Sequence, residues 1–338
     1  MVRYFIQYPA GTGELILDAL ADQIGNVDVH YQDDSALVFD STASESQVGA
    51  ISFVKNAFVV LTGTPRGSID KGVEQLGRVV GKVQIPRQSP KLNKFRTMIH
   101  VDGELSSVNP KSKVALERAI ASRTGARLEP RGMCQEYWVV GRLDMRELLL
   151  CMRLPKPKRP PKARGAISYE LSAMLIHASR PVAREIFLDP FGGSGSLVQA
   201  RLEMPAREIW YSDRDLREFR PQFPREMVSD KRVRLLADDA MTLSSIPDGK
   251  IDVIVTDPPW GEHEDLEGPY PDFAQAMGKS FDRVLHPLHG RFVILCSRRT
   301  SDTIAKSMEG ASFTVRSSHS ILVNGHPATV LIGDRDSR

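Results

Sequence analysis

The residues best suited to chemistry form one short run, Thr256–Gly261, which reads Thr-Asp-Pro-Pro-Trp-Gly and follows the predicted strand Ile251–Val255. Consecutive prolines fix φ and cannot continue a sheet, so Pro258 and Pro259 must end the strand in a rigid turn. Such a turn holds the Asp257 carboxylate and the Pro258 carbonyl in fixed directions, and both groups accept hydrogen bonds. Two acceptors that hold both protons of an exocyclic amine would orient its lone pair toward an electrophile.

Trp260 completes this turn with a flat indole face. A nucleobase stacked on such a face gains about 1–3 kcal/mol. Placement of the reacting atoms, rather than a strong general base, would supply most of the rate, and Asp257 would stabilise the positive charge that the amine acquires. A plain loop and a core tryptophan are the structural alternatives. The position of the turn after a strand, downstream of a glycine-rich turn, favours the catalytic interpretation.

A glycine-rich run, Asp189–Gly195, links a predicted strand at Glu185–Asp189 to a predicted helix at Ser196–Leu202. Ligands of doubly wound sheets bind at such a turn, outside the carboxyl ends of the strands. Glycines without a Cβ let the backbone approach a ligand closely. Within the run, the residues that we expect to contact a ligand are Asp189, Phe191, Gly192, Gly193, Ser194 and Gly195.

Neither common phosphate-binding loop is present in the sequence. The dinucleotide fingerprint needs a third glycine where Val198 stands. The only Gly-Lys-Ser tripeptide, Gly278–Ser280, has Phe273 where the phosphate loop requires its first glycine.

Three aspartates follow three consecutive predicted strands of this half. Asp189 ends the first strand, Asp213 follows the second at the distance where an acid binds ribose hydroxyls, and Asp239 could accept a hydrogen bond from an adenine amine. A single aspartate is more often a helix cap or a surface turn, but three at consecutive strand ends favour one shared ligand. An acidic site suits a cationic nucleoside such as S-adenosylmethionine, which carries an ammonium and a sulfonium but no phosphate.

With these two motifs, residues 167–338 resemble the Rossmann-like S-adenosylmethionine-dependent amino-methyltransferases. The resemblance implies a seven-stranded sheet with an antiparallel last strand, and cofactor contacts at the positions of Asp189, Gly193, Asp213 and Asp239. It also implies that the helix beginning at Ser168 borders the methionine end of the cofactor. Enzymes with a [D/N]-P-P-[Y/F/W] motif modify amines of guanine, adenine or cytosine, or glutamine amides, so Asp257, Pro258, Pro259 and Trp260 specify the reaction rather than the substrate.

The elements around these motifs predict an α/β fold, a doubly wound Rossmann-like sheet. Continuous apolar strands separated by helices indicate a parallel sheet covered on both faces. The predicted strands are 185–189, 208–212, 233–236, 251–256 and 290–296, with two terminal strands around 313–315 and 329–332. The predicted helices are 167–177, 196–202 and 272–284.

The region before residue 153 alternates short strands and helices, which favours α+β sandwiches of the ferredoxin-like kind. The predicted strands are 3–8, 36–40, 57–62, 96–101 and 136–141, and the predicted helices are 13–23, 45–54, 69–80 and 112–124. Basic residues recur through its second part at Arg96, Lys111, Lys113, Arg118, Arg123, Arg127 and Arg131. Such residues are a solvated face or, alternatively, a surface for phosphates.

A chain of 338 residues suggests about two domains. The segment Arg153–Arg164 has six basic residues, four prolines and no acid, which is typical of an extended linker. We therefore predict an amino-terminal THUMP-like RNA-binding region at 1–152, a linker at 153–164 and a methyltransferase domain at 165–338.

The spacing leaves no room for a target-reading domain between Gly195 and Asp257 or after Trp260, which disfavours DNA adenine methylases. Recognition must then come from residues before about 152. This layout, with Phe95–Val101, is similar to the THUMP-containing tRNA guanine-N2 methyltransferases. Methylation of glutamine amides or DNA bases, and a non-catalytic RNA-binding protein that kept the fold, are the alternatives. The acids Glu262, Glu264, Asp265 and Glu267 either face solvent or include one acceptor for a guanine N1–H.

Composition limits the partners. The net charge is +3, too mild to indicate nucleic-acid binding by itself. The three cysteines, Cys134, Cys151 and Cys296, are too far apart for a disulfide framework or a CxxC zinc site, and they fit a reducing cytoplasm. The eight histidines show no metal spacing. No apolar run reaches the roughly 18 residues of a membrane helix, and the start lacks a signal-peptide core. RNA, most readily tRNA, is the expected partner, without a metal or a membrane.

Overall fold

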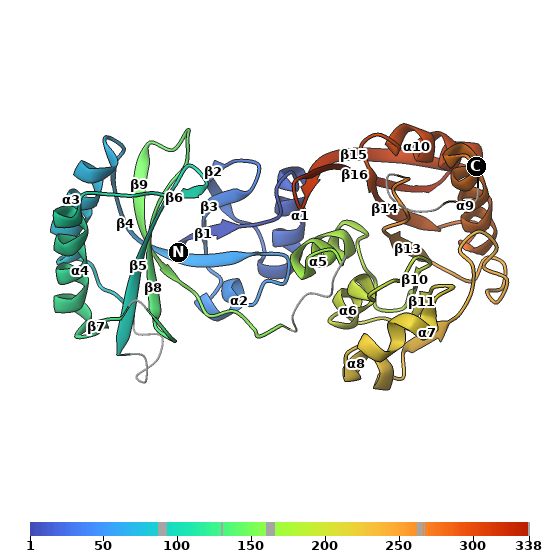
Figure 1. Ribbon diagram of the computed structural model, residues 1–338, viewed down its shortest axis with the longest axis horizontal. Coiled ribbons are helices and arrows are strands. Elements are labelled where there is room, and N and C mark those ends of the chain that lie inside the picture. The colour runs from blue at the N-terminus through green and yellow to red at the C-terminus, as the bar shows by residue number, and fades with distance from the viewer. Residues whose placement is uncertain (87–92, 130, 160–165, 262–265, 267, 337–338) are drawn as a thin grey trace. The chain divides into compact units, whose positions relative to one another are not determined.

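The computed structural model describes residues 1–86, 93–129, 131–159, 166–261, 266 and 268–336. The chain divides into two units (Figure 1). One comprises residues 1–7 and 20–158, and the other comprises residues 8–19 and 159–338. None of the helices within these residues combines the length and the apolar character needed to cross a membrane.

The first strands of the amino-terminal unit follow a ferredoxin-like order. The elements in chain order are β1 (Val2–Gln7), α1 (Gly13–Ile24), β2 (Asp28–Gln32), β3 (Ala36–Ser41), α2 (Glu45–Gly49) and β4 (Asn56–Pro65). Residues 13–19 of α1 belong to the other unit. Their strands lie in the order β2-β3-β1-β4, with antiparallel neighbours throughout. This β-α-β-β-α-β connectivity is ferredoxin-like, the kind of fold that the sequence predicts, although β2 was not among the predicted strands.

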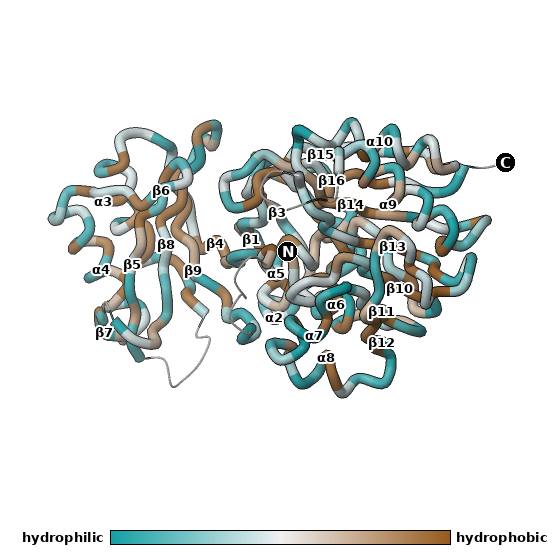
Figure 2. Tube along the Cα trace, turned by 45° about the vertical axis from the view of Figure 1, so that its right-hand side comes forward, coloured by the Kyte–Doolittle hydropathy of each residue, from teal (hydrophilic) through white to brown (hydrophobic). Residues whose placement is uncertain are grey.

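The same sheet continues through β9, β8, β5 and β6, with β7 paired to β5. The elements are α3 (Ile69–Val80), β5 (Lys94–Val101), β6 (Glu104–Leu105), α4 (Pro110–Thr124), β7 (Arg127–Leu128), β8 (Gln135–Gly141) and β9 (Glu147–Arg153). Helices α3 and α4 bury Leu76 and Ile120 against one face of this sheet, and a smaller core around Phe58 fills the other face. Hydrophobic residues accordingly follow the strands in Figure 2.

The carboxy-terminal unit is built on a seven-stranded sheet in the order β12-β11-β10-β13-β14-β16-β15. Its strands are β10 (Ile186–Asp189), β11 (Glu208–Ser212), β12 (Val233–Leu236), β13 (Val253–Thr256), β14 (Arg291–Ser297), β15 (Phe313–Val323) and β16 (His326–Arg335). The first five strands are parallel and β16 is antiparallel to both neighbours. The doubly wound sheet with an antiparallel last strand is thus confirmed.

Helices cover both faces of this sheet. They are α5 (Tyr169–Ala178), α6 (Ser196–Leu202), α7 (Leu216–Phe219), α8 (Arg225–Ser229), α9 (Tyr270–Val284) and α10 (Ser301–Gly310). Ile186 and Leu188 share a core cluster with Met277 of α9 and Ile304 of α10, and Figure 1 shows these helices beside β14 to β16. Phe187 points to the opposite face, because side chains alternate along a strand.

The sheet has a switch point between β10 and β13, where the strand order reverses direction. Asp189 ends β10, and Asp257 directly follows β13. Since the carboxyl ends of parallel strands share one edge, both aspartates lie at the edge where doubly wound sheets bind ligands. The fold therefore brings the two predicted motifs together.

Candidate active site

Asp189 lies inside the protein at the end of β10, with 1% of its surface exposed. Its Oδ1 accepts a hydrogen bond from Thr256 Oγ1 at 2.9 Å and a longer one, 3.4 Å, from the Phe191 N–H. Burial raises the pKa of Asp189 to about 8, with a further contribution from the charges of Asp257 and Asp213, although the two hydrogen bonds oppose this shift. The raised pKa favours the protonated form of the carboxyl, and a nearby cation would favour its ionisation.

The glycine-rich turn packs tightly on β11. A Cβ at Gly192 would lie 2.2 Å from the ring of Tyr211, so no larger residue fits there. The Gly192 N–H donates to the Ser212 carbonyl at 2.9 Å, and the Tyr211 hydroxyl donates to the Gly193 carbonyl at 2.8 Å. Gly195 has φ +76°, a left-handed conformation that glycine adopts readily. Packing within the protein alone thus requires glycine at 192 and favours it at 195.

Asp213 joins this turn to the end of β11. Its Oδ2 accepts the Gly193 N–H at 2.8 Å, and its Oδ1 accepts the Asp215 N–H at 2.8 Å. These two bonds fix the carboxylate at the switch point. Unlike Asp189, it borders the open cavity described below.

The turn after β13 is held from two sides. The Trp260 indole N–H donates to Asp257 Oδ1 at 2.8 Å, and the Tyr270 hydroxyl donates to the Pro259 carbonyl at 3.1 Å. Gly261 has φ +72°, and a Cβ there would lie 2.5 Å from the Tyr270 ring. The sequence predicted a rigid turn but not these partners, because the indole–carboxylate bond and the contact with Tyr270 depend on tertiary packing.

A cavity of about 390 Å³ opens beside this turn. Its walls include six predicted site residues, which are Phe191, Asp213, Asp257, Pro258, Pro259 and Trp260. Four further residues that the sequence analysis did not single out also line it, namely Ile167, Val323, Asn324 and His326. The volume lies in the range of small-molecule sites. The Asn324-Gly325 pair is a strong hairpin signal and could have indicated the last three.

Other predicted residues do not line this cavity. Ser168 is the N-cap of α5 and accepts the Leu171 N–H at 3.2 Å, although its neighbour Ile167 does reach the cavity. The Ser194 hydroxyl lies 2.8 Å from that of Ser196. Asp239 is exposed and accepts the Met241 N–H at 2.8 Å, which is the surface-turn alternative. Cofactor contacts at these positions stay a prediction.

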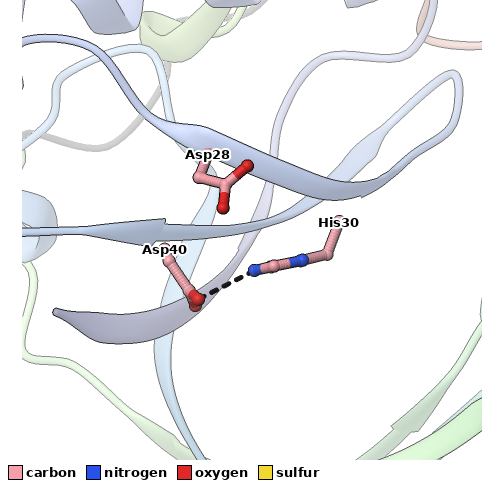
Figure 3. Close-up of side chains that lie close together, drawn as sticks. All are labelled: Asp28, His30 and Asp40. Carbon is pink, nitrogen blue, oxygen red and sulfur yellow. Dashed lines mark ion pairs between the residues drawn. The ribbon is translucent and has the colours of Figure 1, made fainter.

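The acids after the turn, Glu262, Glu264, Asp265 and Glu267, lie outside the described residues. A different group of possible metal ligands exists in the amino-terminal unit, where Asp28, His30 and Asp40 lie together on β2 and β3 (Figure 3). Arg3 Nε donates to Asp40 at 3.0 Å, and Arg3 Nη2 lies 3.2 Å from the His30 Nε2. The guanidinium already supplies the positive charge in this group, which argues against a metal ion there.

Comparison with known proteins connects this site to one chemistry. Residues 225–326 match a family described as an RMKL-like methyltransferase domain, and this segment contains the Asp257 turn. The carboxy-terminal unit thus carries a methyltransferase domain. No curated protein matches the chain.

Among the solved structures that are similar to the chain over almost its full length are the following three. TrmN from Thermus thermophilus has a TM-score of 0.78 and 18% identity, covering 99% of this chain and 100% of that one. SMU.472, described as a methyltransferase complexed with SAH, has a TM-score of 0.68 and 14% identity, covering 100% and 98%. A predicted N6-adenine-specific DNA methylase from Listeria monocytogenes str. 4b F2365 has a TM-score of 0.66 and 14% identity, covering 98% and 95%. At these identities the likeness shows a shared fold.

Proposed function

We propose that this methyltransferase domain transfers a methyl group from S-adenosylmethionine to the exocyclic N2 amine of a guanine in tRNA. The observation that carries the proposal is the fixed turn Asp257–Trp260, which lines a cavity at the switch point of the sheet. Support for the cofactor comes from the carboxylates of this edge. Asp213 lines the cavity and accepts the Gly193 N–H, and we expect it to accept hydrogen bonds from the ribose hydroxyls as well. Asp189 would become easier to ionise beside a cation.

The residues of the turn have separate tasks in this reaction. S-adenosylmethionine supplies the methyl group as a sulfonium. Asp257 and the Pro258 carbonyl would accept hydrogen bonds from the two amine N–H groups, so that the nitrogen lone pair leaves conjugation and is free to attack the methyl group. As the N–C bond forms and the S–C bond of the sulfonium breaks, the Asp257 carboxylate would stabilise the positive charge on the amine. Loss of one amine proton to the solvent of the open cavity would then give the neutral methylated amine. The indole of Trp260 stacks on the base, and its N–H bond to Asp257 holds the carboxylate in place.

The choice of RNA rests on the layout of the chain. A base inside a duplex cannot reach this cavity without being flipped out, whereas a base in a tRNA loop or end is accessible. An amino-terminal unit with ferredoxin-like topology and a basic linker before the catalytic unit supports RNA as the partner. The similar Listeria protein, described as a predicted DNA methylase, makes DNA the alternative that an experiment must test.

Labelled S-adenosylmethionine offered with separate pools of undermodified tRNA, DNA and protein tests the proposal. We expect label in tRNA, recovered by mass spectrometry as N2-methylguanosine, and loss of label with Asp257→Ala. Ser318→Ala, an exposed substitution on β15, is the control and should behave as the wild type. Label in DNA or in glutamine would contradict the substrate. Binding of RNA without heat of cofactor binding in calorimetry would indicate a non-catalytic RNA-binding protein.

A further inference from the structure

The β15–β16 hairpin extends past the rest of the sheet at the catalytic edge. Strand β14 ends its pairing with β16 at Ser297 and Ala328. The hairpin continues beyond this point, because Val323 of β15 still pairs with His326 of β16. The carboxyl end of β14 lies at the same edge as that of β13, since the two strands are parallel. The hairpin tip therefore overhangs the edge that carries Asp257.

The tip has a fixed shape. Asn324 has φ +52° and Gly325 has φ +87°, the positive values at both central residues that define the tight two-residue turn of a hairpin. Val323 anchors the tip, with only 7% of its surface exposed. Asn324 and His326 are exposed, yet both line the 390 Å³ cavity together with Asp257 and Trp260.

Residues 8–19, which belong to the same unit, brace the hairpin. The Leu322 N–H donates to the Ala10 carbonyl at 3.3 Å. Gly11 packs so closely that a Cβ there would lie 2.5 Å from the Cα of Ile321. Glu14 Oε2 lies 2.7 Å from the His319 Nδ1. A bracing segment on the outer strand keeps the tip over the cavity rather than letting it swing away.

We propose that Asn324 and His326 contact the target base and select it as guanine, an inference that rests on the proposed function. Once Asp257 and Pro258 hold the amine, the remaining edge of guanine presents an N1–H donor and an O6 acceptor. The Asn324 carboxamide has an acceptor and a donor, so it complements this edge. Adenine held by its amine presents a ring acceptor and a C–H group, which leaves the carboxamide oxygen without a donor. His326 supplies one further donor or acceptor along the same wall.

The first test compares Asn324→Ala and His326→Ala with Ser318→Ala, in the full-length protein with undermodified tRNA. We expect kcat/KM to fall about tenfold or more in the first two variants, because each leaves base atoms unpaired. The Kd for S-adenosylmethionine should stay within about twofold, and His326→Gln, which keeps a donor and an acceptor, should recover part of the loss. Wild-type kcat/KM in both alanine variants would overturn the proposal.

A second test distinguishes selection of the base by Asn324 from a role of Asn324 in shaping the cavity alone. A synthetic RNA carries 2-aminopurine at the methylated position, which keeps the N2 amine but has a ring acceptor at N1 and a C–H group at C6. A carboxamide at position 324 then leaves one of its two polar groups unpaired in either orientation. We expect the wild type to prefer guanine about tenfold or more, and Asn324→Ala to reduce that preference to about threefold or less. An unchanged preference would overturn selection by Asn324.

The outcome of these tests is distinct from that of the proposed function. If the wild type labels adenine instead of guanine, the proposed substrate is wrong, and guanine selection by this hairpin falls with it. If the wild type labels guanine and both alanine variants do so equally well, the proposed function stands and the role of the hairpin is refuted.

Discussion

The two turns that meet at the switch point of the sheet differ in how their polar groups are used. The turn after β10 directs its groups into the protein. Asp189 is buried and accepts a hydrogen bond from Thr256, and the backbone N–H groups of Gly192 and Gly193 donate to β11 and to Asp213. The turn after β13 is rigid as well, but Asp257 to Trp260 border an open cavity. One turn builds the edge, and the other presents functional groups from it.

Removal of the presented carboxylate should have the largest effect. We expect Asp257→Ala to lower kcat about 10²- to 10³-fold, the scale seen when a group that stabilises transition-state charge is lost. Cofactor affinity should change little, because Asp257 is assigned to the amine. Single-turnover methyl transfer and calorimetry measure the two quantities. A comparable loss of cofactor affinity would show that the two turns do not divide their tasks in this way.

A substitution in the supporting turn should instead act through stability. Gly192→Ala places a methyl group on the Tyr211 ring, and overpacking of this kind costs about 1–3 kcal/mol. We expect a lower free energy of unfolding in denaturant titration, and weaker cofactor binding as the turn shifts. Gly310→Ala is the matched control, since a Cβ there meets no atom within 4 Å. Equal stability of the two variants would contradict the tight packing of the turn.

The hydrogen bond from the Trp260 indole to Asp257 provides a further test of how the turn after β13 works. Trp260→Phe keeps a flat face but removes the N–H that holds Asp257, so we expect a fall in kcat of about tenfold, on the scale of one hydrogen bond to a charged group. Trp210→Phe removes a similar bond to Glu208, at 2.9 Å, outside the cavity. That control should lose stability rather than kcat, measured by thermal unfolding and by single turnover. Equal kcat losses in both would refute a positioning role for Trp260.

The pH dependence of the free energy of unfolding tests whether Asp189, in the turn after β10, is buried as a neutral carboxyl. The pKa of Asp189 is raised from its ordinary 3.8 to about 8 in the folded protein. Its contribution to stability is therefore complete below about pH 3.8 and is lost as the pH rises through about 8, with a slope near −1.4 kcal/mol per pH unit between. Asp189→Asn should remove that slope, so denaturant titrations at pH 6 and pH 7 should differ less in this variant than in the wild type.

Asp238 is a suitable control, because its pKa is lowered in the folded protein whereas that of Asp189 is raised. Burial alone would raise its pKa, but hydrogen bonds from Ser245 and Ser244 lower it overall. Its contribution is present above the unfolded pKa and is lost only as the pH falls below that value. Asp238→Asn should leave the slope between pH 6 and pH 7 unchanged. An Asp189→Asn variant that kept the wild-type slope would show that this carboxyl is ionised in the folded protein.

Sequence reasoning succeeded where local signals and the fold agree. Helix α6 and strands β11 and β12 have the predicted bounds, because a turn-forming residue follows each of them within three positions, namely Pro205, Asp213 and Asp238. Strand β9 was missed since Leu148–Met152 is apolar at every position. The structure explains this, because Leu148 and Leu150 belong to one core and Leu149 and Cys151 to the other. A strand buried on both faces has no alternation that would distinguish it from a buried helical segment, and no predicted helices on either side indicated a parallel sheet here.

The sequence predicted the polar residues at the strand ends, but it did not predict all of the residues that line the cavity. The motifs placed Asp257 and Asp213 at strand ends, and the structure brings them to one cavity. Asn324 and His326 were not found, because the predicted terminal strands stopped short of the hairpin tip. Helix α10 was also missed, since it buries only Ser301, Ile304 and Met308 along its ten residues. Such a narrow apolar stripe gives a weak helical pattern.

The brace between Glu14 and His319 joins positions 305 residues apart in the chain. During synthesis the first partner leaves the ribosome long before the second exists, so this half of the protein can close only after β15 and β16 have emerged. Until then the start of α1 has no partner strand to pack on, although residues 20–158 can already fold. Excising the catalytic half at the linker would remove its own amino-terminal piece, and an active fragment would need that piece supplied in trans or spliced back by circular permutation.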